Sequence, residues 1–152
     1  MQHRLGMLWK KILCAVDFSE CSRDALRVAA RLATEQSAEL VVAYAWTPPV
    51  VFAGETIGLP AGFLIDLIAT AQRELAAWKT EAVGLGATKV TTEFLTGAPW
   101  QEVVSLAKRD RAIGLIVTGT HGRTGIKHAL LGSIAERIVR HSPCAVMVVP
   151  AG

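Results

Sequence analysis

Short apolar runs without polar alternation constrain the fold of this 152-residue chain more than any other sequence feature. Four such runs occur, at Lys11–Val16, Leu40–Trp46, Leu115–Thr118 and Ala145–Val149. Runs of this kind are typical of strands that are covered on both faces of a parallel sheet. A fifth segment, Lys89–Thr96, alternates polar and apolar residues, which favours a strand nearer an edge.

Amphipathic segments separate these strands. Ser19 is a good N-cap for the first of them, and Ala25, Ala29 and Ala33 follow at helical spacing. Further helices are predicted over Gly62–Val83, from Pro99, and over Ser133–His141. Strands that alternate with helices imply a parallel sheet with right-handed crossovers and helices on both faces. The sequence therefore predicts one α/β domain, a single open sheet of five parallel strands, that occupies residues 1–152.

Composition excludes several classes of protein. With 51% hydrophobic and 19% charged residues the chain does not have the composition of a disordered protein. None of its apolar stretches approaches the roughly 18–20 residues that a membrane span needs. The net charge of +3 comes from cations that are interleaved with acids, which favours a solvated surface over a nucleic-acid interface.

The cysteines and the N-terminal segment indicate a reducing compartment. Cys14, Cys21 and Cys144 are odd in number and form no CxxC pair, so neither a disulfide nor a metal site is expected. The first residues lack the apolar core and small-residue cleavage site of an export signal. We expect a cytoplasmic protein.

A glycine-rich segment follows the Leu115–Thr118 strand, at an edge where open parallel sheets bind ligands. Gly119, Gly122 and Gly132 would let the backbone approach an anion closely, and Ser133 begins a helix whose N-terminus favours phosphate. The spacing matches neither a Rossmann GxGxxG after the first strand nor a Walker A loop. Spacing alone leaves two interpretations open: a phosphate cradle, which we favour, or glycines that only make the turn.

Two polar residues lie at the same predicted edge. Asp17 ends the first strand, where it would contact a ligand, cap the following helix or bind loop amides. His121 lies in the glycine-rich loop, where a loop or phosphate-contacting role is favoured over that of a general base. The reason is that no nucleophile or second carboxylate stands at a recognisable spacing from it. We therefore assign no catalytic residue.

Together these residues resemble a known family. The pattern Gly119-x2-Gly122-x9-Gly132-Ser133 is similar to the G-2x-G-9x-G-[S/T] signature of the ATP-binding branch of the universal stress protein (UspA-like) family. Three other segments resemble its opening strand, its entry to the third helix and its closing strand: the run from Lys11 through Asp17-Phe-Ser, Gly97-x-Pro99, and Ser142–Val149. The resemblance covers nearly the whole chain.

The resemblance implies a Rossmann-like or flavodoxin-like sheet of order 3-2-1-4-5, with ATP between the ends of the first and fourth strands. It also implies a homodimer that pairs through strand 145–149. Carried over by position, the residues expected to contact the nucleotide are Ala15, Asp17, Ala45, Thr118, Gly119, His121, Gly122, Arg123, Gly132, Ser133 and Ile134. The glycines and Ser133 would contact phosphates, with His121 and Arg123 in the same loop.

The remaining positions surround the sugar and the base. Asp17, with Ala15 beside it, would face the ribose or a metal ion, Mg²⁺ or Mn²⁺, bound to the phosphates. Thr118 would line the ribose side, and Ala45 would lie near the adenine.

The expected function is regulatory ATP binding in a stress response, with ATP and a second copy of the chain as partners and with neither nucleic acid nor membrane. Two alternatives remain. One is slow ATP hydrolysis or adenylate transfer in the same cleft. The other is a dimeric scaffold that binds no nucleotide.

Overall fold

Five strands alternate with four helices along the chain. The strands are β1 (Lys11–Val16), β2 (Glu39–Trp46), β3 (Val90–Thr96), β4 (Ile113–Gly119) and β5 (Ala145–Val149). The helices are α1 (Glu20–Gln36), α2 (Ala61–Gly84), α3 (Pro99–Arg109) and α4 (Ser133–His141). The computed structural model describes residues 8–48, 60–121 and 131–152. Within these residues, no helix is both long and apolar enough to cross a membrane.

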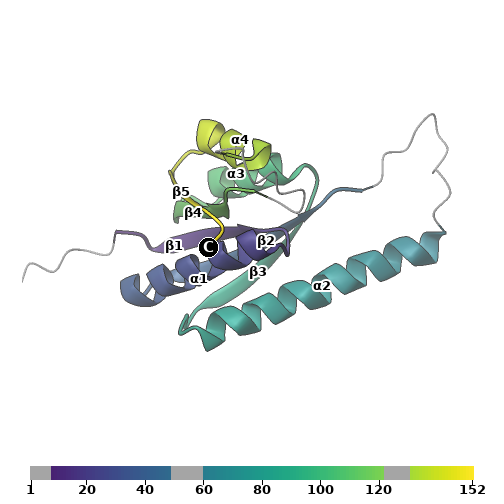
Figure 1. The fold of residues 1–152 in the computed structure, drawn as a ribbon, viewed down its shortest axis with the longest axis horizontal. Coiled ribbons are helices and arrows are strands. Elements are labelled where there is room, and N and C mark those ends of the chain that lie inside the picture. Colours follow the sequence, from purple (N-terminus) through teal and green to yellow (C-terminus); the bar gives the residue numbers. More distant parts are fainter. Residues whose placement is uncertain (1–7, 49–59, 122–130) are drawn as a thin grey trace, which may run out of the picture.

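The strands form one parallel sheet in the order β3-β2-β1-β4-β5 (Figure 1). The predicted α/β class, the five parallel strands and the order 3-2-1-4-5 are confirmed. The polar segment β3 lies at one edge of the sheet, as its alternation predicted, and β5 lies at the other.

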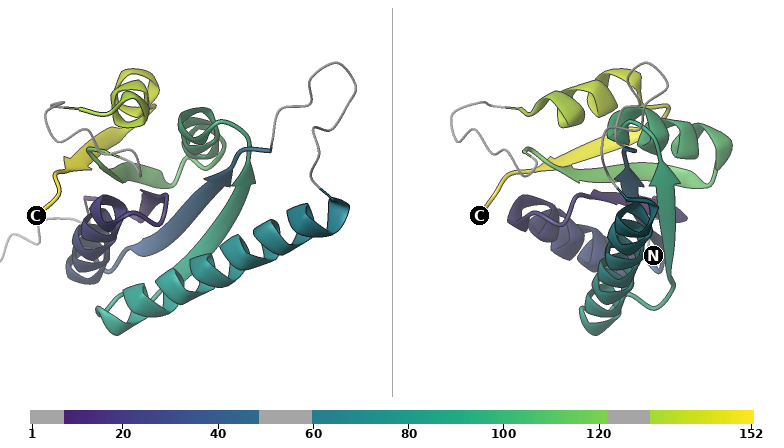
Figure 2. Two further views of the ribbon diagram at one scale, coloured as in Figure 1. Left: turned by 45° about the vertical axis from the view of Figure 1, so that its right-hand side comes forward. Right: turned by 90° about the vertical axis from the view of Figure 1, so that its right-hand side faces the viewer.

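Helices cover both faces of the sheet, α1 and α2 on one face and α3 and α4 on the other (Figure 2). A hydrophobic cluster lies beneath each pair of helices. Successive side chains of a strand point to opposite faces. Ile12 and Cys14 of β1 therefore pack in one cluster with residues of α1 and α2, whereas Leu13 packs in a second cluster with residues of α3 and α4. The high apolar fraction of the sequence follows from this double coverage.

Several element boundaries differ from the predicted ones. The strand predicted over Leu115–Thr118 extends from Ile113 to Gly119, so Gly119 belongs to a strand and not to the loop. Pairing with β5 explains this, because the N–H of Thr120 still donates to the carbonyl of Val149 at 3.0 Å. The bounds of β1, β5 and α4 are as predicted. Those of β2 and β3 differ by one residue at the N-terminal end, and α2 is one residue longer at each end.

Candidate functional site

The carboxyl ends of β1 and β4 lie side by side, because these strands are parallel neighbours in the middle of the sheet. Cys14 of β1 is opposite Val117 of β4, so the two strands end at nearly the same level. The chain leaves β1 directly into α1, and α4 follows β4 in sequence. This is the edge at which open parallel sheets bind ligands.

Asp17 takes part in the capping network of α1. Its Oδ1 accepts the N–H of Ser19 at 3.0 Å, and its own N–H donates to the hydroxyl of Ser22 at 3.2 Å. Ser19 is the N-cap that the sequence predicted, and its hydroxyl accepts the N–H of Ser22 at 3.2 Å. Asp17 therefore binds a loop amide, as one of its alternatives predicted, whereas the cap of α1 is Ser19.

Phe18, between Asp17 and Ser19, adopts a left-handed backbone conformation with φ of 64°. For a residue with a side chain this costs about 1–2 kcal/mol. Its ring stacks on Tyr44 with centroids 4.4 Å apart and meets Trp78 edge-on at 5.4 Å. Aromatic pairs contribute about 0.5–1.5 kcal/mol each beyond their buried area. The two ring contacts therefore offset the backbone strain.

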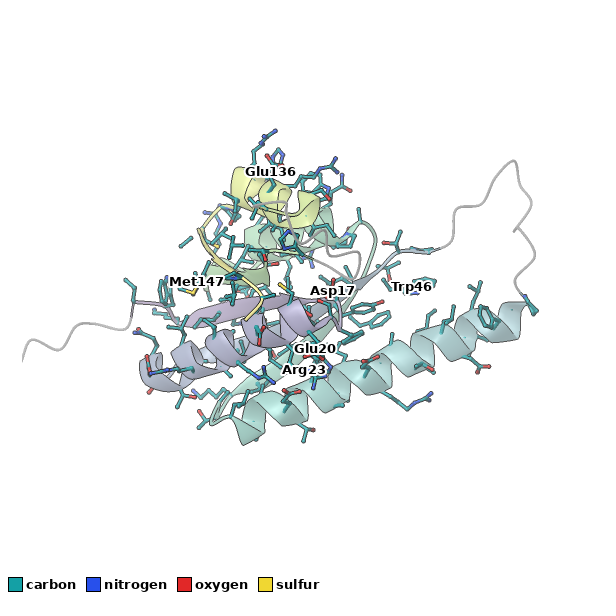
Figure 3. All side chains as sticks on the ribbon, viewed as in Figure 1. Asp17, Glu20, Arg23, Trp46, Glu136 and Met147 are labelled. Atoms are coloured by element: carbon teal, nitrogen blue, oxygen red, sulfur yellow. The ribbon has the colours of Figure 1, made fainter. Side chains whose placement is uncertain are left out.

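The start of α1 is further tied to α2 by Arg23. Its guanidinium lies 4.9 Å from the ring centroid of Trp78 and 3.6 Å from the carboxylate of Glu81. Asp17, Glu20 and Arg23 follow one another along the end of β1 and the first turns of α1 (Figure 3).

The N-terminus of α4 is held against the end of β4. The N–H of Gly132, the N-cap of α4, donates to the carbonyl of Thr120 at 2.6 Å. A Cβ at position 132 would itself lie 2.6 Å from that oxygen, so this approach requires glycine. Gly132 has no side chain that could cap the helix, and the next residues, Ser133 and Ile134, are exposed.

One acidic residue lies in the first turn of α4, where it opposes anion binding. This residue is Glu136, and it forms an ion pair with Arg140 one turn later. The pair offsets part of the negative charge near the helix N-terminus, where the macrodipole favours anions.

The end of β4 packs against the first turn of α1. A Cβ on Gly119 would lie 2.7 Å from Sγ of Cys21, so glycine at 119 has a packing reason. The hydroxyl of Thr120 lies 3.6 Å from that sulfur and 3.0 Å from Nδ1 of His121. Sequence reasoning missed Cys21 and Thr120, because no spacing rule connects residues 99 positions apart.

The remaining described positions are half-buried or buried. Ala15 and Ala45 are half-buried and pack against the hydrophobic cluster on the α3 and α4 side. Thr118 is buried, and its hydroxyl donates to the carbonyl of Gly119 at 3.4 Å. Gly122 and Arg123 lie outside the described residues.

Two observations concern metal and thiol groups at this edge. No group of three or more His, Cys, Asp or Glu side chains in the described ranges is placed to hold a metal ion. Cys14, in β1 beneath this edge, is fully buried, and burial raises the pKa of its thiol to about 12. It therefore stays protonated at neutral pH and behaves as a small apolar group.

Comparison with known proteins identifies relatives along almost the whole chain. The family model described as "Universal stress protein family" matches residues 8–150. Universal stress protein MJ0531 of Methanocaldococcus jannaschii is 38% identical over 147 residues, which cover 93% of this chain and 82% of that protein.

Solved structures share the fold. Universal stress protein UspA from Lactobacillus plantarum superposes with a TM-score of 0.81 at 26% identity, over 93% of this chain and 97% of that one. A universal stress protein crystallised in complex with cAMP superposes with a TM-score of 0.73 at 25% identity, over 95% and 98% of the two chains.

Proposed function

Because this chain belongs to the universal stress protein family, we propose that it binds ATP at the carboxyl ends of β1 and β4 as a regulatory ligand. A solved relative in complex with cAMP supports an adenine nucleotide as the ligand class. The glycine and serine positions of the resemblance support ATP as the particular nucleotide.

The position of the α4 N-terminus is the observation that carries the proposal. The 2.6 Å bond from Gly132 to Thr120 holds this helix end against β4, next to the end of β1. A helix N-terminus carries roughly half a positive charge and offers N–H donors to phosphate. At α1 the side chains of Asp17 and Ser19 already accept such donors, whereas the N-cap of α4 has no side chain that competes with a phosphate.

Each expected residue has a role in this proposal. Ser133 adds a hydroxyl donor to the phosphates, beside Gly119, Gly132 and Ile134. His121, Gly122 and Arg123 complete the phosphate side.

The sugar, the base and the metal are assigned to the ends of β1, β2 and β4. The small side chains of Ala15 and Ala45 leave room for the base, and Thr118 lies toward the ribose. Asp17 faces the ribose or a phosphate-bound Mg²⁺ or Mn²⁺. Because the described residues supply no metal cluster, phosphate oxygens and water would provide most of the metal's ligands.

Occupancy matters more than turnover in this account. His121, at this edge, has its Nδ1 3.0 Å from the hydroxyl of Thr120, its neighbour in sequence. In this proposal bound nucleotide acts by its different affinity for alternative states of the protein or its partners.

A homodimer through β5 is part of the proposal. β5 is an edge strand, Ala145 is exposed, and the other four residues of the strand are only half-buried. An apolar edge of this kind is a template for pairing with a second chain. The free cysteines Cys14, Cys21 and Cys144 suit a reducing compartment such as the cytoplasm.

The direct test is to denature the purified protein and identify the released nucleotide by chromatography. ATP in the supernatant is the expected result. Ser133→Ala should lower the amount retained, and Ser105→Ala on α3 should leave it unchanged. ADP together with measurable turnover would favour the hydrolase alternative, and no nucleotide in repeated preparations would favour the scaffold.

A further inference from the structure

We propose that Phe18 is a positioning residue for the nucleotide: its ring, held by Tyr44 and Trp78, fixes the backbone that presents Asp17 at the end of β1. This inference rests on the proposed function and deepens it. In this inference the aromatic cluster of Phe18, Tyr44 and Trp78 keeps the carboxylate of Asp17 in place.

The backbone of Phe18 adopts an unusual conformation. Among the described residues, only Phe18 and Ser37 adopt a positive φ without being glycine. Ser37 is the C-cap of α1, where a left-handed residue is ordinary. Phe18 lies in the loop between β1 and α1, and a bulky residue with positive φ is a true outlier of the kind found at functional sites.

Aromatic rings from other elements hold Phe18 in this conformation. Tyr44 comes from β2 and Trp78 from α2, and Phe94 of β3 extends the cluster by contacting Tyr44 at 5.8 Å between centroids. Because these rings come from distant parts of the chain, tertiary packing and not local sequence imposes the conformation of residue 18.

The backbone conformation of Phe18 also fixes the position of Asp17 at the site. The bond from the Ser19 N–H to Oδ1 of Asp17 closes a small loop around Phe18. If residue 18 relaxed to the ordinary negative φ, Asp17 and Ser19 would turn relative to each other and this bond would break. Asp17 would then lose its orientation toward the nucleotide edge, although neither Phe18 nor its ring partners need contact the nucleotide.

A double-mutant cycle on ATP affinity tests this route. Phe18→Ala removes the ring but keeps a side chain that disfavours positive φ, and it should weaken ATP binding about tenfold. Phe18→Gly tolerates the left-handed conformation and should lose less ATP affinity than Phe18→Ala. Phe18→Tyr retains the ring and should bind ATP as tightly as the wild type. In an Asp17→Asn background, Phe18→Ala should have little further effect, because both changes act through the same carboxylate.

A second measurement needs no nucleotide. Hydrogen exchange of the Ser19 amide reports the bond to Asp17, and it should accelerate in Phe18→Ala and stay at the wild-type rate in Phe63→Ala. Phe63 is an exposed aromatic residue of α2. Both measurements are made where circular dichroism shows every variant folded, so that loss of stability alone changes neither affinity nor local exchange.

The possible results distinguish failure of the positioning role of Phe18 from failure of the proposed ATP binding. Wild-type ATP affinity in Phe18→Ala, or an undiminished effect of Phe18→Ala in the Asp17→Asn background, would overturn the positioning role and leave the proposed function standing. An unchanged Ser19 exchange rate in Phe18→Ala would also overturn it. A wild-type protein with no affinity for ATP would overturn the proposed function and this inference together.

Discussion

Gly119, the last residue of β4, lies directly against Cys21 in the first turn of α1: a Cβ built on the glycine would be 2.7 Å from Sγ of that cysteine. The carbonyl group of Cys21 would also be tight against it, at 3.1 Å. One glycine of the G-2x-G-9x-G-[S/T] pattern therefore serves the packing of a strand end on a helix.

Gly119→Ala should lower the free energy of unfolding by about 1–3 kcal/mol, the usual cost of an extra methyl group in a packed interior. Part of this cost should disappear in a Cys21→Ala background, because the nearest atom is then gone. Urea unfolding of the single and double variants measures both effects. Gly84→Ala is the matched control, since a Cβ there has no neighbour within 4 Å. Equal costs in both backgrounds would refute the assigned contact.

The ion pair of Lys11 with Asp110 predicts a dependence of stability on pH. The hydrogen bond from Lys11, with Nζ 2.8 Å from Oδ2, holds the pKa of Asp110 below its ordinary value, helped by the N–H of Ala112. A depressed pKa contributes stability that is complete above the unfolded value, about 3.9, and is lost as pH falls through the folded value. The same bond raises the pKa of Lys11, whose contribution is lost only as pH rises through that higher value.

Asp110→Asn should therefore destabilise the protein modestly at pH 7, by about 1 kcal/mol or less for a partly exposed pair. The difference from the wild type should shrink as pH falls below about 4. Denaturant unfolding across this pH range checks it. Asp66→Asn, in an exposed position of α2, is the control. If the difference in free energy of unfolding between Asp110→Asn and the wild type does not change with pH, the ion pair with Lys11 does not account for it.

The three thiols should react at different rates. Cys14 is fully buried with a pKa raised to about 12, and Cys21 is also buried, whereas Cys144 is half-buried near the surface. Ellman's reagent at pH 8 should label Cys144 in the native protein and the other two only after unfolding. Cys144→Ala should abolish the native reaction. Peptide mapping that finds rapid label on Cys14 would be incompatible with this packing.

The proposed β5 dimer predicts the effect of a charge at the strand edge. Val148→Lys should shift the protein toward monomer, because a lysine on an edge strand opposes pairing between chains. Light scattering after size exclusion measures this shift. Val139→Lys, at an exposed position of α4, should leave the mass unchanged. A monomeric wild type, or a dimer that survives Val148→Lys, would exclude this interface.

Much of the fold was predictable because hydrophobic periodicity is a local property. Unbroken apolar runs marked the interior strands β1, β2 and β4, and the polar alternation of β3 marked an edge. Ser19 was predictable as an N-cap because capping depends on neighbours within one turn. The strand order came from the family resemblance, since no local pattern specifies which strands are neighbours.

The site was predictable only in part. Glycine and serine spacing indicated the α4 N-terminus, but the contact of Gly119 with Cys21 joins residues far apart in sequence. The left-handed conformation of Phe18 had no sequence signal, because it follows from rings that β2 and α2 supply. Tertiary contacts of this kind are set by the fold as a whole and leave no local pattern.

Calorimetric titration of ATP into nucleotide-free protein, wild type against Gly132→Val, tests the central proposal most directly. A side chain at 132 would meet the carbonyl oxygen of Thr120 at 2.6 Å and push the α4 N-terminus away from β4. Gly62→Ala, where a Cβ has open space, is the control. The account predicts one ATP per chain for the wild type and for Gly62→Ala, and at least tenfold weaker binding for a still-folded Gly132→Val. Equal affinity in the wild type and Gly132→Val, or no binding to the wild type, would contradict it.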